Sequence, residues 1–396
     1  MRKHLLFVAT AASGHINPTL PLVEALIRRG HRVTYPVPDA FTDQVRRTGA
    51  DVVPAPPLVF GSGGPRGGKF EFTAEVVERM AGGFADGLGA KVEPLVERFA
   101  DAPPDAVCYT SMAIEGAAVA GILGVPGIQL YPSYASNEHY AVRDEFLPTD
   151  AEPRAAVLEA MERVAARLRS RAEELGVRRD IGGFFAPPPE DLNLVFIPRE
   201  FQYAGDTFDG RYHFIGPSRR TDSAAGWEPP TGDRRLLFIS LGTAFNTDAD
   251  FFRRCLEAFG DTDWDVAMAI GTKVTAADLG TVPDNFDVRP FFPQQAVLEH
   301  AAAFITHAGM NSVMEGGWHQ VPMAAVPQMP EQAANARRIS ELDLGTVVGD
   351  GGLREAVDAV VGDPKIKVGL AAVRRAVDDA GGADAGVDAI EKYLLR

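Results

Sequence analysis

The chain has 396 residues, of which 46% are hydrophobic and 23% are charged, a composition typical of a globular protein with room for two domains. Its formal net charge is −15 at pH 7 and no Lys/Arg cluster interrupts it, so we predict no nucleic-acid partner, because this field repels polyanions. The two cysteines, Cys108 and Cys255, argue against a disulfide framework and favour the reducing cytoplasm.

The N-terminal stretch MRKHLLFVATAASG imitates a signal peptide, but its apolar run is too short for one. We predict instead a strand at residues 5–10, then a turn and a helix that begins at Pro18, is capped by Asn17 and ends at Gly30. No apolar run in the sequence is long enough to span a bilayer, so we expect no membrane span and a soluble, cytoplasmic protein.

A strand at residues 32–37 completes a βαβ unit, which implies a parallel sheet. The stretch PDAVCYTS, residues 104–111, repeats the pattern: we interpret it as a strand, and a helix, a glycine and another strand follow. We therefore predict one doubly wound α/β domain over residues 1–216.

Residues 217–233 are rich in Pro, Gly, Ser and charge, which is typical of a linker. Alternation resumes beyond it and predicts a second α/β domain over residues 234–375, followed by a helical tail, 376–396, with a Gly-Gly break. The predicted elements of the second domain are strands at 234–240, 264–271, 302–306 and 322–327 and helices at 248–260, 294–301 and 312–320. Ligands of open α/β sheets bind at the carboxyl ends of strands, so functional residues should follow these strands.

Polar and small residues follow the predicted strand at 302–306. A helix that begins near Asn311 or Ser312 would present free backbone N–H groups and the positive end of its dipole, and such a terminus binds phosphate. His307 could add a hydrogen bond or a charge to a diphosphate, and Gly309 would let the backbone approach the ligand closely.

Further polar and aromatic positions lie on both sides of this turn. Glu315, about one helical turn further on, is placed to accept from ribose hydroxyls; the alternative is that Ser312 and Glu315 only form a capping box. Upstream, the stretch PFFPQ offers an aromatic face for a nucleobase, and downstream Glu331 and Gln332 could hold sugar hydroxyls. In chain order these positions describe base, diphosphate, ribose and hexose.

Residues 291–335 resemble the nucleotide-sugar signature of family 1 glycosyltransferases: aromatic-x-Pro-Gln, then His-x-Gly-x-Asn-Ser-x-x-Glu, then acid-Gln. The stretch GHINPTLPLVEALIRRGHRVTY also resembles the opening of actinobacterial macrolide glycosyltransferases. The resemblance implies a GT-B fold, with two Rossmann-like domains facing each other across a cleft, the first binding the acceptor and the second the nucleotide sugar. It implies inverting transfer of a hexose, from UDP-glucose or alternatively a TDP-sugar, onto a hydrophobic natural product such as a macrolide or polyphenol.

The resemblance also implies a role for each matching position. The nucleotide would be held by Phe291, where the family usually has Trp, and by Gln294, and the ribose by Glu315. The remaining donor contacts would come from His307, Gly309, Asn311, Ser312 and Thr243 at the diphosphate, from Glu331 and Gln332 at the hexose, and from Gly14.

His15 is the candidate catalytic base, because a neutral imidazole after the first strand could take the proton of an attacking acceptor hydroxyl. The alternative is a histidine that only caps the local turn. The family usually supplies an Asp that stabilises the imidazolium, at the end of the strand in PDxVxxD, but here Thr110 stands in its place with Ser111 next. A hydroxyl can orient the ring but carries no negative charge, so Thr110 and Ser111 are candidates for positioning only.

The stretch GGPRGGKF, residues 63–70, fits a phosphate-binding loop only partly, because Phe70 stands where Ser or Thr would reach Mg²⁺ and no strand precedes it. We interpret it as a glycine-rich loop that borders the acceptor site together with LYPSYASNEHY, residues 130–140; an ordinary surface loop and core aromatics are the alternative.

No metal-ligand motif is present, so we expect no metal and no further cofactor, with the leaving-group charge met by the helix terminus, His307 and Thr243. The rival functions are a nucleotide-sugar epimerase of the same architecture, a dehydrogenase, which the missing G-x-G-x-x-G disfavours, and a nucleotide-binding protein with little catalysis. The acceptor, O- or N-glycosylation and formation of a homodimer are left open by the sequence.

Overall fold

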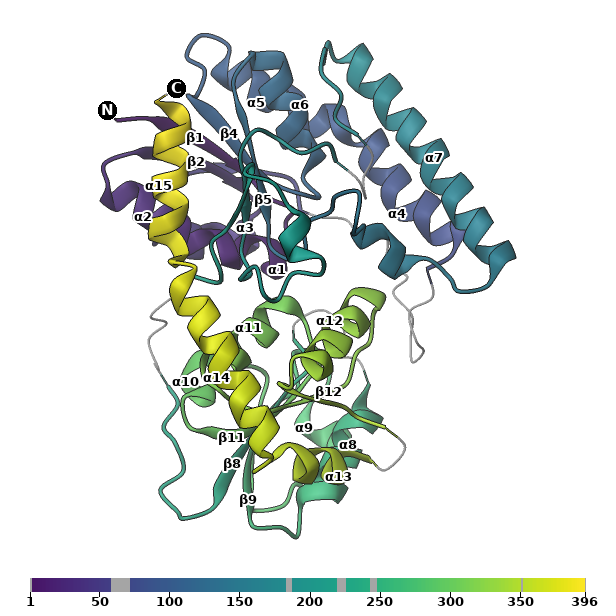
Figure 1. Ribbon diagram of the computed structural model, residues 1–396, viewed down its shortest axis with the longest axis vertical. Coiled ribbons are helices and arrows are strands. Elements are labelled where there is room, and N and C mark those ends of the chain that lie inside the picture. The colour runs from purple at the N-terminus through teal and green to yellow at the C-terminus, as the bar shows by residue number, and fades with distance from the viewer. Residues whose placement is uncertain are drawn as a thin grey trace. The chain divides into compact units, whose positions relative to one another are not determined.

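The computed structural model describes residues 2–57, 72–182, 187–218, 226–242, 248–349 and 352–395. It divides into two compact units. Of the described residues, those up to 218 and from 380 onward form the first unit, and those from 226 to 379 form the second. Each unit is an α/β layer structure with helices packed on a central sheet (Figure 1).

The first unit is built on a parallel sheet. Within the described residues its strand order is β3-β2-β1-β4-β5-β6-β7, so the order reverses between β1 and β4. The strands are β1 His4–Val8, β2 Arg32–Val37, β3 Asp51–Pro54, β4 Ala106–Thr110, β5 Gly127–Tyr131, β6 Asn193–Val195 and β7 Tyr212–Phe214. The prediction of a doubly wound domain with strands at β1, β2, β4 and β5 is confirmed.

The helices of the first unit cover this sheet and extend beyond it. They are α1 Ser13–Ile16, η1 Asn17–Thr19, α2 Leu20–Arg28, α3 Asp39–Arg46, α4 Ala74–Asp86, α5 Leu88–Phe99, α6 Ile114–Leu123, η2 Val142–Phe146, α7 Ala151–Glu174, η3 Gly205–Thr207 and α15 Gly382–Leu394. Helices α4 and α7 pack along each other at one side of the unit (Figure 1). Leu5, Phe7, Leu22 and Leu26 lie in the buried core between β1 and α2.

The predicted cap at Asn17 is wrong. The chain enters helix at Ser13, passes through a 3-10 turn over residues 17–19 and continues as α2 from Leu20. Asn17 therefore lies inside a continuous helical path in the right-handed conformation, whereas a capping residue has extended dihedral angles. Asn17 therefore does not act as a helix cap, and its side chain is left for other contacts.

The second unit repeats the same topology. Within the described residues its parallel order is β10-β9-β8-β11-β12-β13, with β8 Arg235–Ser240, β9 Trp264–Ala269, β10 Phe286–Arg289, β11 Ala301–Thr306, β12 Met323–Ala325 and β13 Gly345–Val347. Its helices are α8 Ala249–Phe259, α9 Ala276–Leu279, α10 Gln294–Leu298, α11 Met310–Trp318, α12 Pro330–Glu341, α13 Gly352–Val360 and α14 Pro364–Asp379. The predicted class, two Rossmann-like α/β domains, is confirmed.

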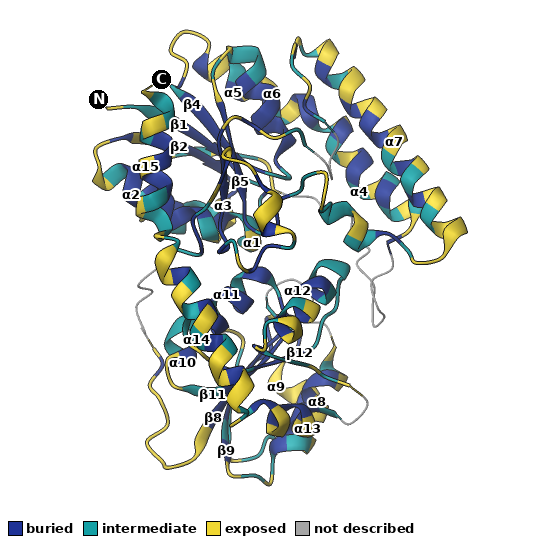
Figure 2. Ribbon diagram, viewed as in Figure 1, coloured by how far each residue is buried: buried dark blue, intermediate teal, exposed yellow. Residues whose placement is uncertain are grey.

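The burial pattern explains these elements. The central strands of each sheet are buried, the edge strands β3, β10 and β13 are only partly covered, and most helices expose one face (Figure 2). Strand β8 reads RLLFIS and is buried from Leu236 to Ser240, as expected for a parallel strand covered on both sides. Among the described helices, none is both long enough and apolar enough to cross a membrane.

The C-terminal helix α15 belongs to the first unit, which the sequence did not decide. The predicted Gly-Gly break is confirmed, because Gly381 and Gly382 both have left-handed dihedral angles between α14 and α15. Val387 and Ile390 of α15 are buried in the core of the first unit, and Arg28 of α2 pairs with Asp384 at 2.6 Å.

Candidate functional site

The loop between β11 and α11 carries the predicted anion-binding turn. Helix α11 begins at Met310 with Gly309 as its N-cap, one to two residues earlier than predicted. Its first intrahelical acceptor, the carbonyl of Gly309, receives the N–H of Val313 at 3.0 Å. The N–H groups of residues 309–312 have no acceptor among the described residues. Four adjacent donors at the positive end of a helix dipole form an anion-binding cradle.

His307 is fixed beside this cradle by two glycines. A Cβ atom at Gly309 would lie 2.4 Å from His307 Nε2, and one at Gly242 would lie 2.7 Å from the same atom. Gly309 has φ −63°, so packing and not backbone conformation requires glycine there. Because β8 and β11 are neighbours in the sheet, the imidazole lies where the strand order reverses, which is where open α/β sheets bind ligands.

The electrostatic state of His307 follows from its surroundings. Burial lowers the pKa of His307 to about 4, opposed in part by a hydrogen bond with the backbone of Ser240. The ring is therefore neutral at pH 7. Its Nδ1 atom is covered and has no hydrogen-bond partner among the described residues. An anion in the cradle would stabilise the protonated ring, in which both nitrogens are donors.

Two glutamines of α10 hold Glu315, the predicted ribose acceptor. Gln294 Nε2 donates to Glu315 Oε2 at 2.6 Å and to Ser312 Oγ at 3.1 Å, and Gln295 Nε2 donates to Glu315 Oε1 at 3.4 Å. The alternative capping-box reading is wrong, because Gly309 is the N-cap of α11 and no side chain caps the helix. The structure thus brings together Gln294, Ser312 and Glu315, as the sequence pattern predicted, and adds Gln295.

The two phenylalanines of PFFPQ have different environments. Phe291 is 56% exposed, whereas Phe292 is partly buried and packs edge-to-face on Phe238 with ring centroids 6.0 Å apart. An exposed aromatic ring next to a polar cluster is the kind of surface on which a nucleobase stacks. Phe291 is therefore the ring available to a ligand.

Glu331 and Gln332 occupy the first turn of α12 and not a loop. Gln332 is buried, and its Oε1 atom accepts from the N–H of Gln328 at 2.8 Å. Its amide nitrogen has no acceptor among the described residues, so it can donate to a ligand. The side chain is thereby fixed with its donor end free.

Two predicted segments cannot be assessed in the structure. Thr243, predicted at the β-phosphate, lies outside the described residues, although the preceding Gly242 is described. The glycine-rich stretch at residues 63–70, predicted to border the acceptor site, also lies outside them. Both stay predictions.

His15, the predicted catalytic base, lies in the one-turn helix α1 directly after β1. Burial lowers the pKa of His15 to about 4, so the ring is neutral and able to accept a proton at pH 7. His15 as a residue is partly exposed, but its Nδ1 atom is covered and has no hydrogen-bond partner among the described residues. The neighbouring Gly14 is exposed, and a Cβ atom there would meet nothing within 4 Å. The fold itself does not require glycine at this position.

Thr110 ends β4 and Ser111 follows it, at the point where the strand order of the first unit reverses. Thr110 is fully buried, and its Oγ1 atom accepts from the backbone N–H of Thr10 at 3.2 Å. No hydrogen bond joins Thr110 or Ser111 to His15 among the described contacts. Thr10 Oγ1 is also buried, and no described residue provides it with a hydrogen-bond partner. His15 therefore lacks the orienting contact that Thr110 was predicted to give it.

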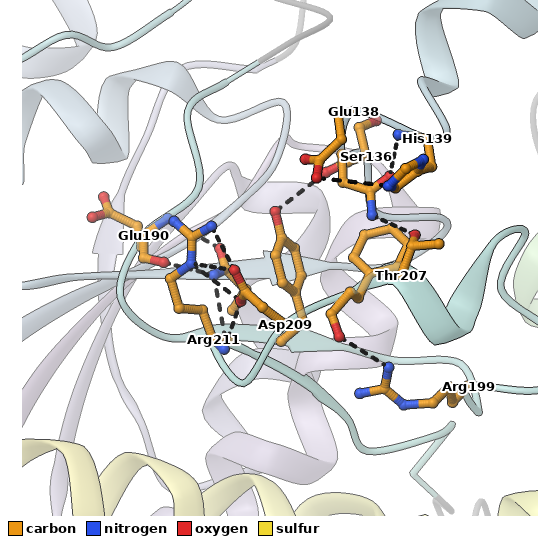
Figure 3. Close-up of polar contacts among 12 residues, drawn as sticks. Ser136, Glu138, His139, Glu190, Arg199, Thr207, Asp209 and Arg211 are labelled. Carbon is orange, nitrogen blue, oxygen red and sulfur yellow. Dashed lines mark hydrogen bonds and ion pairs between the residues drawn. The ribbon is translucent and has the colours of Figure 1, made fainter.

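The aromatic stretch at residues 130–140 packs into a ring cluster of the first unit. Tyr134 stacks on Phe201 with centroids 6.0 Å apart, and Tyr140 stacks on Tyr203 at 5.3 Å. Polar contacts hold the same loop in place, including the hydroxyl of Tyr212 on the carbonyl of Ser136 at 3.2 Å (Figure 3). The core-aromatics alternative therefore describes these rings in this structure.

The segment over residues 199–211, which contacts the stretch at residues 130–140, is held in place by hydrogen bonds and an ion pair among its own residues. Arg199 donates to the carbonyl of Gly205 at 2.6 Å, and Asp209 pairs with Arg211 at 2.8 Å (Figure 3). Among the described residues, no group of three or more His, Cys, Asp or Glu side chains is gathered in a way that could hold a metal ion.

Sequence reasoning missed three contributors: Gln295, Asn335 and the packing role of Gly242. Gln295 adjoins the predicted Gln294, and Gly242 lies in the SLGT stretch, so both were close to recognised positions. The contacts of these residues depend on which strands are neighbours in the sheet, and a local sequence pattern does not indicate strand order.

Comparison with known proteins agrees with this geometry. Residues 230–375 match the family described as UDP-glucoronosyl and UDP-glucosyl transferase. Over 99% of its length the chain is 38% identical to demethyllactenocin mycarosyltransferase from Streptomyces fradiae, covering 86% of that protein. It is 35% identical to the NDP-glycosyltransferase YjiC of Bacillus licheniformis, with 99% and 98% covered. The crystal structure of CalG4, the calicheamicin glycosyltransferase, superposes with a TM-score of 0.80 at 32% identity, over 100% of this chain and 99% of that one.

These relatives extend over both units, and their similarity exceeds what a shared fold alone produces. The predicted GT-B class agrees with the solved neighbour. The chain is therefore a glycosyltransferase with the GT-B fold and belongs to the UDP-glucoronosyl and UDP-glucosyl transferase family.

Proposed function

We propose that this enzyme transfers a hexose, glucose from UDP-glucose, onto a hydroxyl of a hydrophobic natural product such as a macrolide or polyphenol, with inversion and without a metal ion. The observation that carries the proposal is the row of N–H groups at residues 309–312, which have no acceptor among the described residues, next to the buried imidazole of His307. Four donors and a neighbouring imidazole neutralise a leaving diphosphate as charge develops on it.

The remaining donor contacts follow from the same surface. The exposed Phe291 ring would stack on the uracil, and Glu315, held by Gln294 and Gln295, would accept from the ribose hydroxyls. Gln332, with its carbonyl fixed and its amide N–H₂ free, would donate to a hexose hydroxyl, and Glu331 would accept from another.

The chemical step needs a base for the acceptor hydroxyl. His15 is neutral at pH 7, and we propose that its Nε2 atom takes the hydroxyl proton while the oxygen attacks the anomeric carbon. Attack on the face opposite the diphosphate inverts the configuration. The electron pair of the broken C–O bond leaves with the diphosphate, which the cradle of the second unit stabilises.

The proposed acceptor is a hydrophobic natural product because two relatives carry such names. One is named as the calicheamicin glycosyltransferase, and another, 32% identical over 99% of this chain, is the oleandomycin glycosyltransferase of Streptomyces antibioticus.

A TDP-sugar is the second candidate donor. The relative with 38% identity is named as a mycarosyltransferase, and Phe291 offers a smaller stacking face than the usual Trp. Calorimetric titration with UDP, 2′-deoxy-UDP and TDP separates the candidates, because the first pair differs only in the ribose 2′-hydroxyl and the second pair only in the base methyl group. A preference for UDP over 2′-deoxy-UDP supports UDP-glucose.

The experiment that tests the proposal incubates the purified protein with UDP-glucose and a panel of macrolide and polyphenol acceptors, with and without EDTA. We expect a mass gain of one hexosyl unit on at least one acceptor, unchanged by EDTA, with a β-linkage in the NMR spectrum of the product. Conversion of UDP-glucose to another UDP-hexose without a glycoside would support the epimerase alternative instead. Loss of transfer in EDTA would reject the metal-independent mechanism.

A further inference from the structure

We propose that Asn335 is a positioning residue that sets the anion-binding cradle by fixing the peptide group between Ala308 and Gly309. Asn335 lies on α12, fully buried, and its Nδ2 atom donates to the carbonyl oxygen of Ala308 at 2.8 Å. No ligand contact is assigned to Asn335. The inference rests on the proposed function of the cradle as the diphosphate site.

The backbone at Ala308 is unusual and over-determined. Ala308 has φ +60°, a left-handed conformation that an L-residue other than glycine rarely adopts. Two buried contacts hold it there: Thr306 Oγ1 accepts from the Ala308 N–H at 3.1 Å, and Asn335 holds the Ala308 carbonyl. Residues held in sparsely populated conformations by their surroundings cluster at functional sites.

The orientation of one peptide plane follows from these contacts. In a trans peptide the C=O and the N–H point in opposite directions. Because the Ala308 carbonyl points to Asn335 in the interior, the N–H of Gly309 points away from it. That N–H is the first of the four at residues 309–312 without an acceptor among the described residues. A flipped peptide would instead turn a carbonyl dipole toward the bound anion.

Asn335 is not explained by stability alone. Its Oδ1 atom is buried and has no hydrogen-bond partner among the described residues. Burying an unsatisfied carbonyl destabilises the folded state, so the site carries a group that an apolar residue would avoid. The amide N–H₂ of Asn335 is needed to donate to the Ala308 carbonyl. The unpaired Oδ1 atom is present because it belongs to the same amide group.

The test compares ligands with and without phosphates. UDP binding is measured by calorimetry, and uridine binding by ligand-observed NMR, for wild type, Asn335→Asp and Asn335→Leu. Both variants keep the branched shape of Asn; one places an oxygen against the Ala308 carbonyl, and the other removes the donor without adding charge. We expect each to weaken UDP binding roughly tenfold or more, as for the loss of a hydrogen bond to a charged group, with uridine affinity changed less than about twofold.

Asn285→Asp is the matched control. Asn285 in the same unit also donates from Nδ2 to buried carbonyls, those of Phe259 at 2.9 Å and Trp264 at 2.8 Å, and its Oδ1 is also unpartnered. Asn285 directly precedes β10 and contacts the first residue of β9, whereas the cradle follows the end of β11, so the two lie at opposite ends of the parallel strands. This change should lower the thermal unfolding midpoint and leave the ratio of UDP to uridine affinity as in wild type.

The outcomes separate the inference from the proposed function. If both Asn335 variants lose affinity for UDP and for uridine by the same factor, or keep the wild-type ratio of the two affinities, the positioning role is overturned. The proposed donor site is not affected by that result. A wild-type protein that binds no UDP overturns the donor site and the inference together. Selective loss of UDP affinity in Asn335→Leu, if the Asp variant fails to fold, is sufficient support.

Discussion

The imidazole of His307 lies against the backbone of Gly242, so closely that a Cβ atom at Gly242 would come within 2.7 Å of the ring carbon Cε1 and of Nε2. The two residues are far apart in sequence and meet because β8 and β11 are neighbours in the sheet. The equivalent position in the first unit, between the ends of β1 and β4, holds His15 and Thr110. Each unit therefore carries its candidate chemistry where its strand order reverses.

Alanine at three glycines should separate crowding of His307 from backbone strain. In Gly309→Ala the added Cβ atom clashes with the His307 ring without backbone strain. In Gly242→Ala the same clash is combined with the strain of φ +75°. In Gly280→Ala the Cβ atom meets nothing within 4 Å, so only the strain of φ +80° is added. We expect loss of UDP affinity in the first two and not in the third, which should lose about 1–3 kcal/mol of stability because residues other than glycine rarely adopt its dihedral angles. Calorimetry and chemical denaturation measure these quantities. Unchanged UDP affinity in Gly309→Ala would show that the ring can move without consequence.

Stability should fall as the pH is lowered below the ordinary range of histidine. The folded pKa of both His15 and His307 is about 4, below the ordinary histidine value of 6.5, so the unfolded chain binds more protons between these values. Their contribution is complete above pH 6.5 and is lost as the pH falls toward 4, by about 2 kcal/mol for each ring at pH 5.

The measurement is the free energy of unfolding at pH 7.5 and pH 5 for wild type, His15→Gln and His307→Gln. Each variant should lose less stability than wild type on acidification. An equal loss in all three proteins would mean that neither ring is held neutral by burial.

His15→Ala should reduce kcat by a factor of about 10² to 10⁴, because the acceptor hydroxyl loses its general base. UDP affinity should be retained, since none of the proposed donor contacts in the second unit is altered. Steady-state transfer and calorimetry with UDP test the two halves of this statement. Transfer at the wild-type rate in this variant would exclude His15 as the base.

Thr110→Asp should restore the charged partner that the family usually supplies to the imidazole. A carboxylate near His15 favours the imidazolium, so the pKa of His15 should rise and the acid limb of the kcat profile should move to higher pH. Thr110→Asn, with the same shape and no charge, is the control and should leave the limb in place. Identical profiles for the two variants would show that residue 110 does not communicate with His15.

Ile390→Ala should destabilise the first unit by about 2–5 kcal/mol, because Ile390 of α15 is fully buried in its core. Lys392→Ala, two residues further along the same helix, should have little effect. Denaturation followed by intrinsic fluorescence, with UDP affinity as a readout for the second unit, locates the loss. A two-state curve unchanged by Ile390→Ala would show that α15 is dispensable.

Local pattern predicted a large part of the fold. Strands β1, β2, β4, β5, β8, β9, β11 and β12 follow from apolar runs of strand length, and helices follow from glycine and capping signals. Strands β3, β6, β7, β10 and β13 were not predicted. Each has only three or four residues, which gives little periodic signal, whereas the equally short β12 lies in the longer apolar stretch PMAAVP. The interpretation of Asn17 as a cap was wrong because a cap and a residue inside a helical turn use the same side chain, and only the backbone conformation distinguishes them.

The candidate donor site was also predictable as a set of residues. His307, Gly309, Ser312 and Glu315 follow one strand at fixed spacing, and a helix start has free donors whatever surrounds it. Their contacts with Gln295, Gly242 and Asn335 were not predictable, because these residues come from other elements. Thr110 in place of the usual Asp already suggested that His15 Nδ1 would find no charged partner, and none is present among the described residues. That Thr110 Oγ1 instead accepts from the backbone N–H of Thr10 depends on the pairing of β1 with β4 and could not be predicted.

The sequence by itself determined that the chain forms two α/β domains of a glycosyltransferase and which residues lie at the strand ends, since hydrophobic periodicity and motif spacing are local properties of the chain. Only the tertiary structure decided that His307 is held between two glycines, that Ala308 is kept in a left-handed conformation by Asn335, and that α15 completes the first unit. These contacts join residues that strand order brings together, and strand order is fixed by the free energy of packing the whole sheet and its helices.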